Sequence, residues 1–308
     1  MAEKSFRPLL SPQKVPAYPK HARRMKINRY YGVIRDNFTI STWLLIGGLF
    51  QGMAVALLGY LTLLPTAAVI AYRVGDNLAM ARGWKRNRYL SGVLLNRFTA
   101  QVPRSDGSFG STPAERSVVV FIIGSKCNHP LGLFDPVYRK VADYFAATVR
   151  ELEDTPEESG LLGRTSWIGD RETAANELMT VMYFRDFESL HKYAHGPLHI
   201  KAVKYWSSIV KDTPHVSIFH ETYVVPKGQW ENIYVNSRPT GLSAAAFPVR
   251  SAQGNGETEW MSPIVDARHA NLRTAAGRIQ ADYLKGYEEK QSESWNQANE
   301  ADYGNLAP

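Results

Sequence analysis

Three histidines have a spacing that could support metal or acid–base chemistry. His191, His195 and His199 recur every four residues, so on one unbroken helix their imidazoles would share a face. Gly196-Pro197 lies between the second and third histidines and predicts a break in that helix. We therefore interpret them as capping or hydrogen-bonding groups near a kink, and predict no metal site.

His220 and Glu221 are neighbours in a run of strand-forming residues, 215–225. Neighbours on a strand point to opposite faces, so only one of the two can face a given pocket. His220 shares its row with valine and isoleucine, where an unpaired polar group costs about 1–3 kcal/mol. His220 is thus a hydrogen-bonded core histidine or the base of a site. Glu221 with Tyr223 either lines the other face or lies at a helix or dimer contact.

Further candidates are a loop histidine, a cysteine and several aromatic side chains. His129 follows the first predicted strand in a His-Pro loop, and loop residues at strand ends often line sites. Cys127 is the single cysteine, which excludes an internal disulfide framework; we expect an inert buried thiol rather than a Cys–His nucleophile. The aromatic residues suited to an apolar pocket, or else to the core, are Trp167, Trp206, Trp230 and Tyr234.

These candidates depend on a β-α-β-β-α-β domain predicted within residues 117–250. Strands are predicted at 117–125, 161–169, 177–185 and 215–225, with helices after Asp135-Pro136 and after Asp186. This order is the ferredoxin-like split unit, whose crossovers leave one face of an antiparallel sheet open. We predict an α+β fold whose open face is buried against a partner. In one large superfamily of this topology, two such sheets close into a dimeric α/β barrel, and dimerisation is expected here by that analogy.

The excess of positive charge lies in the N-terminal third of the chain. Residues 1–36 hold nine Lys or Arg and two acidic residues, residues 37–72 hold no charged side chain, and residues 73–104 hold seven basic and one acidic. Basic segments on both sides of an apolar run favour binding to anionic lipid headgroups over binding to nucleic acid. Membrane lipids are therefore an expected partner.

The apolar run 37–72 predicts a membrane anchor. Its first part, Phe38–Leu58, is long enough for one span, and Gly59 and Pro65 are suited to break the run into a shallow hairpin. The basic flanks favour the cytoplasmic side for both ends. The sequence is compatible with a hairpin, a single span or a buried pair of soluble helices. With a hairpin, the folded domain would lie in the cytosol, and we expect the endoplasmic-reticulum membrane.

Few helices and strands are predicted in the remaining segments of the chain. Residues 1–36 are a basic N-terminal segment, and residues 73–116 a basic juxtamembrane segment and linker. Residues 251–308 are predicted to contain a linker, a helix beginning at Ser262-Pro263 and a polar tail.

Five sequence blocks carry a resemblance to a known family. They are 128–132 (NHPLG), 193–199 (YAHGPLH) with Trp206, 215–223 (HVSIFHETY), 230–236 (WENIYVN) and 238–242 (RPTGL). With these blocks, residues 117–243 resemble the fungal monooxygenase-like family named after a fumagillin-pathway enzyme, of the antibiotic-biosynthesis-monooxygenase type. The resemblance implies a homodimer and oxygenation of a lipophilic small molecule, a terpenoid or polyketide intermediate.

The implied oxygenation sets the roles expected of the candidates. The chain has no GxGxxG, Walker, HExxH or GxSxG signature, so we predict no flavin or nicotinamide and expect no cofactor. A cofactor-independent oxygenase needs a base, an apolar pocket and a donor for the developing oxyanion. We predict His220 or His195 as base and His129 or Tyr223 as donor. The predicted substrate contacts are Trp167, His199, Glu221, Trp230 and Tyr234.

Two alternatives remain. Some related dimeric barrels bind haem through a helix histidine, in which case His195 or His199 would be the axial ligand. A non-catalytic membrane adaptor or lipophilic carrier would keep the anchor and the pocket without needing the histidines.

Overall fold

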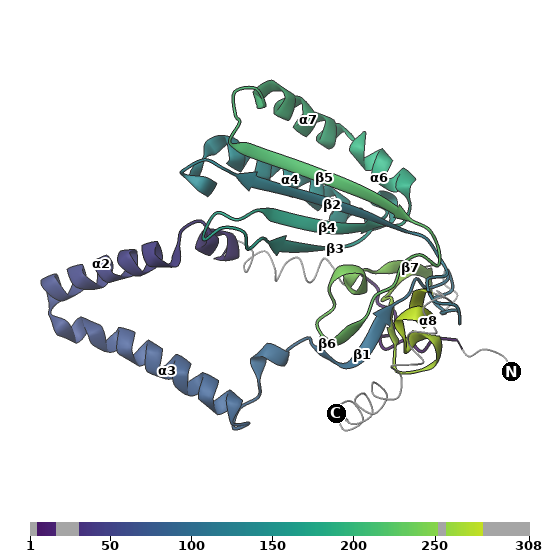
Figure 1. Cartoon of the computed structure of the whole chain (residues 1–308), viewed down its shortest axis with the longest axis horizontal. Coiled ribbons are helices and arrows are strands. Elements are labelled where there is room, and N and C mark those ends of the chain that lie inside the picture. Colours follow the sequence, from purple (N-terminus) through teal and green to yellow (C-terminus); the bar gives the residue numbers. More distant parts are fainter. Residues whose placement is uncertain (1–4, 17–30, 252–256, 280–308) are drawn as a thin grey trace.

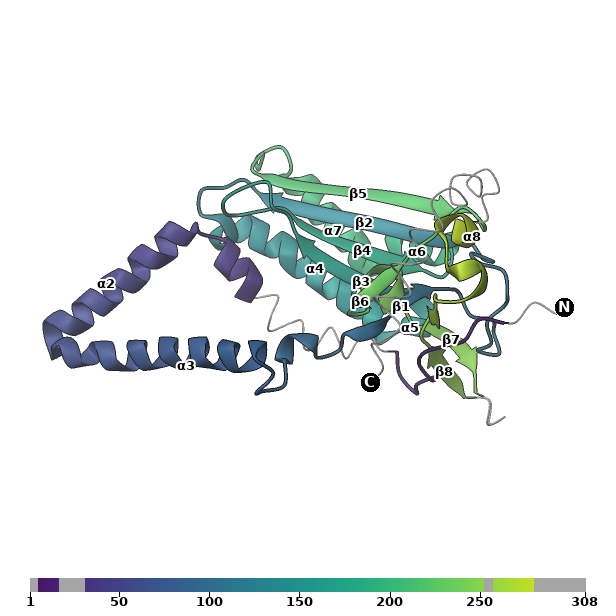
Figure 2. The same ribbon diagram turned by 60° about the horizontal axis from the view of Figure 1, so that its bottom comes forward.

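The protein consists of a four-stranded sheet with helices on one face, a smaller lobe beneath it, and a helical hairpin that projects from both (Figure 1). In the computed structural model the described residues are 5–16, 31–251 and 257–279. The hairpin points away from the two sheets in both views (Figures 1 and 2).

The main sheet has the predicted ferredoxin-like topology. Its strands are β2 (Val118–Cys127), β3 (Leu161–Ile168), β4 (Leu178–Phe184) and β5 (Val216–Val225), in the order β3-β4-β2-β5 with every pair antiparallel. Helices α4 (Pro136–Asp154) and α5 (Pro156–Ser159) connect β2 to β3, and α6 (Phe187–Ala194) and α7 (Pro197–Ile209) connect β4 to β5. The predicted helix break at Gly196-Pro197 is confirmed.

Capping side chains and apolar packing explain where the helices lie. Asp135 Oδ2 accepts a hydrogen bond from Tyr138 N at 2.8 Å, and Asp186 Oδ1 accepts one from Ser189 N at 2.7 Å, so both predicted aspartate caps are present. These helices bury one face of the sheet. The core between them contains Val119, Phe121, Val149, Leu152, Leu161, Met182, Phe184 and Leu190.

The opposite face, here called the open face, is set by the strand register. Val120 pairs with Tyr183 on β4 and Tyr223 on β5, and Ile122 pairs with Val181 and Glu221, so these side chains share one side. The open face consists of Val120, Ile122, Thr165, Trp167, Met179, Val181, Tyr183, Phe219, Glu221 and Tyr223. It is half-buried in its centre and exposed towards β5.

The smaller lobe corrects several predictions. Its three-stranded sheet has β1 (Leu94–Ala100) between β6 (Tyr234–Ser237) and β9 (Ile264–Asp266), beside a hairpin of β7 (Phe247–Arg250) and β8 (Thr258–Met261). The segments predicted as linkers therefore contain β1 and β8. The helix predicted from Ser262 was wrong for residues 264–266, which form β9. Within the described residues, helix α8 lies at Ala275–Ile279. The β-branched pair Ile264-Val265 is fully buried in the sheet, an environment that outweighs its helix-compatible spacing.

The polar segment 105–116 is also packed rather than free. Phe109 and Ala114 are 3% and 1% exposed, and Phe109 belongs to a small core with Phe6 and Leu272. Part of the basic N-terminal segment joins this lobe too, because Pro8 bridges Val265 on β9. The predicted tail beyond residue 279 lies outside the described residues.

The apolar run forms two helices joined by a short turn. They are α2 (Ile40–Leu58) and α3 (Leu63–Ala81), with a 3-10 turn at Tyr60–Thr62. Gln51, a polar residue of α2, donates to Thr62 O at 3.2 Å and accepts from Thr66 Oγ1 at 2.8 Å, which ties the helices together near their turn. No residue of α2 is buried within the chain, and on α3 the buried residues are Asp76 and Met80, near its C-terminal end. Among the described residues, α2 alone is long and apolar enough to cross a membrane.

Gly163 on β3 determines how closely the smaller lobe approaches the open face. A Cβ at this position would lie 2.8 Å from Ala245 Cα, a backbone atom that cannot rotate away. We expect Gly163→Ala to lower the free energy of unfolding by about 1–3 kcal/mol, measured by thermal denaturation. Gly169→Ala, where the nearest atom is 3.4 Å away, is the control and should change it little. Equal stability of the two variants would contradict this packing.

Candidate active site

The helix histidines cap the kink between α6 and α7. His195 Nδ1 lies 2.9 Å from His191 O, and His199 Nδ1 lies 2.8 Å from Ala194 O. The His191 and His195 rings are 4.2 Å apart, whereas His199 follows the break on α7. Within the described ranges, no group of three or more His, Cys, Asp or Glu side chains is arranged to hold a metal ion. These histidines lie in the helix layer, behind the open face.

His129 and Cys127 lie at the end of the sheet next to the hairpin. His129 Nδ1 accepts a hydrogen bond from Leu131 N at 3.1 Å, and its ring is 5.0 Å from that of His215. Cys127 donates to Gly132 O at 3.1 Å, and burial raises the pKa of its thiol, so the cysteine is protonated and structural at neutral pH. His215 Nε2 is 3.3 Å from Asp135 Oδ2, without the geometry of a hydrogen bond.

The predicted split of His220 from Glu221 is confirmed by the register of β5. His220 pairs with Ile123 on the helix side, and its exposed ring lies 5.7 Å from Phe121. Glu221 is on the open face, where its Oε2 accepts a 2.6 Å hydrogen bond from Tyr223 Oη. This bond to the carboxylate raises the pKa of Tyr223, which therefore stays protonated as a donor. Glu221 and Tyr223 are the candidate polar pair that the structure brings together.

The aromatic candidates are dispersed. Trp167 is on the open face and 49% exposed, whereas Trp206 packs beside Val216 in the core, as expected. Trp230 is 8% exposed, and its Nε1 donates to Arg116 O at 2.7 Å. Tyr234 stacks on a phenylalanine of β1 with ring centroids 5.1 Å apart, and burial raises its pKa. The structure therefore gives Trp230 and Tyr234 positions in the packing between the two sheets.

A cleft that the sequence did not predict lies where the main sheet meets the smaller lobe. Its volume is about 540 Å³, within the usual size of small-molecule sites. Tyr183 on the open face also lines this cleft, and burial raises its pKa to about 12. The other lining residues are Val102, Glu115, Arg116, Ser117, Val118, Leu162, Phe184, Arg185, Pro226, Lys227, Leu242 and Phe247.

Two basic residues that line the cleft can be placed side by side from the sequence once the pairing of β2 with β5 is known. Arg116 precedes β2 and Lys227 follows β5, and these strands pair antiparallel along their whole length. The start of β2 therefore meets the end of β5, which brings the two basic residues to one edge of the sheet.

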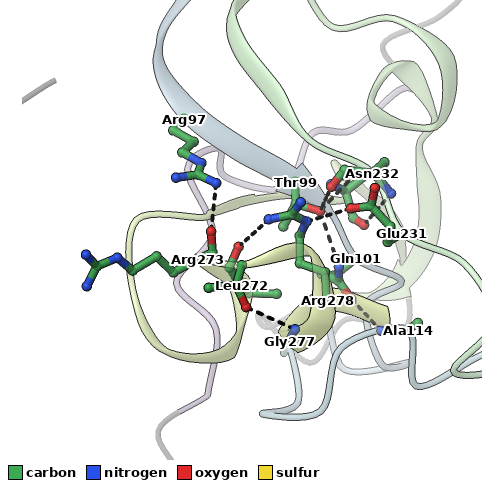
Figure 3. Close-up of polar contacts among 12 residues, drawn as sticks. Arg97, Thr99, Gln101, Ala114, Glu231, Asn232, Leu272, Arg273, Gly277 and Arg278 are labelled. Carbon is green, nitrogen blue, oxygen red and sulfur yellow. Dashed lines mark hydrogen bonds and ion pairs between the residues drawn. The ribbon is translucent and has the colours of Figure 1, made fainter. Parts of the chain in front are cut away.

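Figure 3 shows a polar network around Thr99, Gln101 and Asn232 that reaches Ala114, two residues before Arg116. Asn232 Oδ1 accepts from Ala100 N at 2.6 Å and from Thr99 Oγ1 at 3.0 Å, and its Nδ2 donates to Ala100 O at 3.2 Å. Gln101 Oε1 accepts from Ala114 N at 2.8 Å, on the turn that leads to Arg116. Asn232 therefore replaces a strand partner at the end of β1, and Gln101 links β1 to the turn that leads to Arg116.

We expect Asn232→Ala to destabilise the smaller lobe. It removes three hydrogen bonds and leaves a part-buried backbone N–H of β1 without its acceptor, at a cost of about 1–3 kcal/mol in the free energy of unfolding. Asn128→Ala, at an exposed loop position, is the control. Hydrogen exchange of the β1 amides measures the effect, and unchanged protection in Asn232→Ala would contradict the role of this side chain.

Comparison with known proteins points to one family. Residues 118–242 match the family described as monooxygenase af470-like. The curated monooxygenase af470 of Aspergillus fumigatus is 32% identical over 281 residues, which cover 91% of this chain and 99% of that protein.

Solved structures are similar to parts of the chain at low identity. A mutant of SnoaB, described as a cofactor-independent oxygenase from Streptomyces nogalater, is 12% identical with a TM-score of 0.23, over 34% of this chain and 90% of that one. An aldoxime dehydratase is 11% identical with a TM-score of 0.35, over 41% and 36%. A dimeric protein of ferredoxin-like fold from Bacteroides fragilis is 15% identical with a TM-score of 0.25, over 35% and 95%. Scores of this size carry no argument about chemistry.

Proposed function

Because this chain belongs to the monooxygenase af470-like family, we propose that it oxidises a lipophilic small molecule on the open face of its sheet while its helical hairpin holds it on a membrane. Family membership makes the protein a monooxygenase-type enzyme. The observation that carries the choice of site is the Glu221–Tyr223 pair, a 2.6 Å hydrogen bond on an otherwise largely apolar face.

The pair supplies the two groups that a cofactor-independent oxygenation requires. Glu221 carboxylate takes a proton from a substrate CH2 group, and the carbanion adds O2 to give a peroxide that takes up this proton as a hydroperoxide. Loss of the second C–H proton breaks the O–O bond and releases water, so the CH2 group becomes a carbonyl and the substrate itself supplies the four electrons. Once Glu221 is protonated it no longer holds the Tyr223 hydroxyl as a carboxylate acceptor, and Tyr223 Oη then donates its hydrogen bond to the developing oxyanion. The second candidate base is His220, one of the two bases predicted from the sequence. Its ring lies beside Phe121 on the helix side of the same strand.

A second copy of the chain is the proposed cover of the open face. Trp167 and Tyr223 are 49% and 48% exposed there, and the apolar residues between them are only half-buried. Closure by a second sheet would exclude water, which strengthens the electrostatic contacts of Glu221 and protects a carbanion from protonation. The active form is accordingly a homodimer.

The hairpin is the proposed membrane anchor. Its exposed apolar side chains favour lipid contact, and Asn37 at its start accepts a hydrogen bond from Leu133 N at 2.8 Å, next to the main sheet. On α3, Asp76 is neutralised by Lys85 and Arg88, which leaves a basic surface at the hairpin base. This charge pattern supports a hairpin with both ends cytosolic, on the endoplasmic-reticulum membrane as the proposed compartment.

An absorption spectrum of the detergent-purified full-length protein tests the cofactor-independent mechanism. We expect protein absorbance alone, together with oxygen uptake on a terpenoid or polyketide panel. An intense Soret band would overturn the mechanism in favour of haem held by the helix histidines. A flavin spectrum would contradict it as well.

A further inference from the structure

The cleft between the main sheet and the smaller lobe has an apolar floor and an uncompensated basic rim. Leu162, Leu242, Phe247 and Val118 form its apolar lining, with Tyr183. Among its charged residues, Arg185 is paired with Asp186 at 2.9 Å and Glu115 with Arg104 at 3.4 Å. The two cations that are left carry no ion pair within the part of the chain that the structure describes: Arg116 and Lys227.

The backbone holds these two cations on adjoining segments. Gly228 N donates to Ala114 O at 2.9 Å, and Trp230 Nε1 donates to Arg116 O at 2.7 Å, so the segment after β5 is tied to the segment before β2. Ala114 has a φ of 50°, a left-handed conformation that is uncommon without glycine. The Gln101 hydrogen bond to Ala114 N holds this turn in place (Figure 3). The backbone that carries Arg116 and Lys227 is therefore held in place at this edge, while their exposed side chains extend from it.

We propose that this cleft binds an amphipathic anion, with its apolar body on the floor and its carboxylate or phosphate at Arg116 and Lys227. Two cations with no protein partner favour an anionic head, and an apolar floor of this kind favours a hydrocarbon body. Tyr183 belongs both to the cleft and to the open face, so a molecule bound here extends towards Glu221 and Tyr223. This inference rests on the proposed function, because the bound anion is taken to be the substrate. The substrate is then a lipophilic molecule with an acidic head group.

The test compares octanoate, octyl phosphate and octanol, which share one chain and differ in the head. Binding to the full-length protein in zwitterionic micelles is measured by isothermal titration calorimetry, with protein-free micelles as the blank. We expect one or both anions to bind at least about tenfold more tightly than octanol, because an anionic head accepts charge-assisted hydrogen bonds that a hydroxyl group does not. The ratio of the dissociation constants of octanoate and octyl phosphate shows whether the site prefers a carboxylate or a phosphate head group. Octanol binding as tightly as both anions would overturn the proposal.

Variants assign the selectivity to the rim. The double variant Arg116→Gln/Lys227→Gln should lose about tenfold in affinity for the preferred anion and keep its octanol affinity within about twofold. Lys211→Gln, an exposed lysine elsewhere, should change neither. Unchanged anion affinity in the double variant, or an equal loss for anion and alcohol, would overturn the assignment. The single variants repeat the test should the double variant lose its native circular dichroism.

These measurements need no turnover. If the anions do not bind, the role of Glu221 in catalysis is still tested separately by the activity of its variants. Conversely, a Glu221 variant that has lost activity should still bind the anion.

Discussion

Replacing Glu221 with glutamine should reduce turnover by at least about a hundredfold, the usual contribution of a positioned general base. Glutamine keeps the size of the side chain and can still accept the hydrogen bond from Tyr223, so the open face should keep its geometry. What is lost is the carboxylate that takes the substrate proton. The measurement is the initial rate of oxygen uptake at saturating substrate.

The matched control for this prediction is the neighbouring residue on the same strand. His220→Gln changes a titratable side chain on the helix side of β5, and its rate should stay within a few-fold of the native rate. The reverse pattern, with His220→Gln inactive and Glu221→Gln active, would move the chemistry to the helix side. Full activity in both variants would remove both candidate bases.

Two lysines placed in the middle of α2 should release the protein from membranes. Leu45 and Leu49 are 74% and 67% exposed on this uncharged helix, and each lysine costs about 2.5–3.5 kcal/mol at the centre of a bilayer. We expect the native protein to float with vesicles in a density gradient and Leu45→Lys/Leu49→Lys to remain at the bottom.

The control places the same substitution on an exposed helix of the folded domain. Ile200 and Val203 on α7 are 41% and 46% exposed, and Ile200→Lys/Val203→Lys should float like the native protein. Flotation of the α2 variant to the same extent would show that the hairpin is not the anchor.

The ferredoxin-like domain could be predicted because its elements carry local signals. The β-branched run of β2, the aspartate caps of α4 and α6 and the Gly196-Pro197 break are each specified by a few neighbouring residues. Strand alternation likewise separated His220 from Glu221. Alternation alone does not say which side the helices cover, so the sequence left open which of the two faces a pocket.

The sequence does not predict the smaller lobe, because the strands of this lobe pair with segments that are far away in the chain. Ile264-Val265 fits a short strand and a helix equally well, and pairing with β1, more than 160 residues earlier, decides between them. Trp230 is predicted from the sequence as a substrate contact, yet its indole donates to Arg116 O, and the nearby Asn232 side chain accepts from Ala100 N on β1. The cleft itself depends on these distant contacts, which no spacing in the sequence reveals.

The proposed enzyme places one atom of molecular oxygen into a lipophilic substrate without a bound cofactor. Incubation of the native full-length protein with the terpenoid and polyketide panel under ¹⁸O₂, with no reductant added, tests it by mass spectrometry of the products. We predict a product that carries a single ¹⁸O atom, with the second atom released as water. No labelled product, or a labelled product only when NADPH is supplied, would contradict the account.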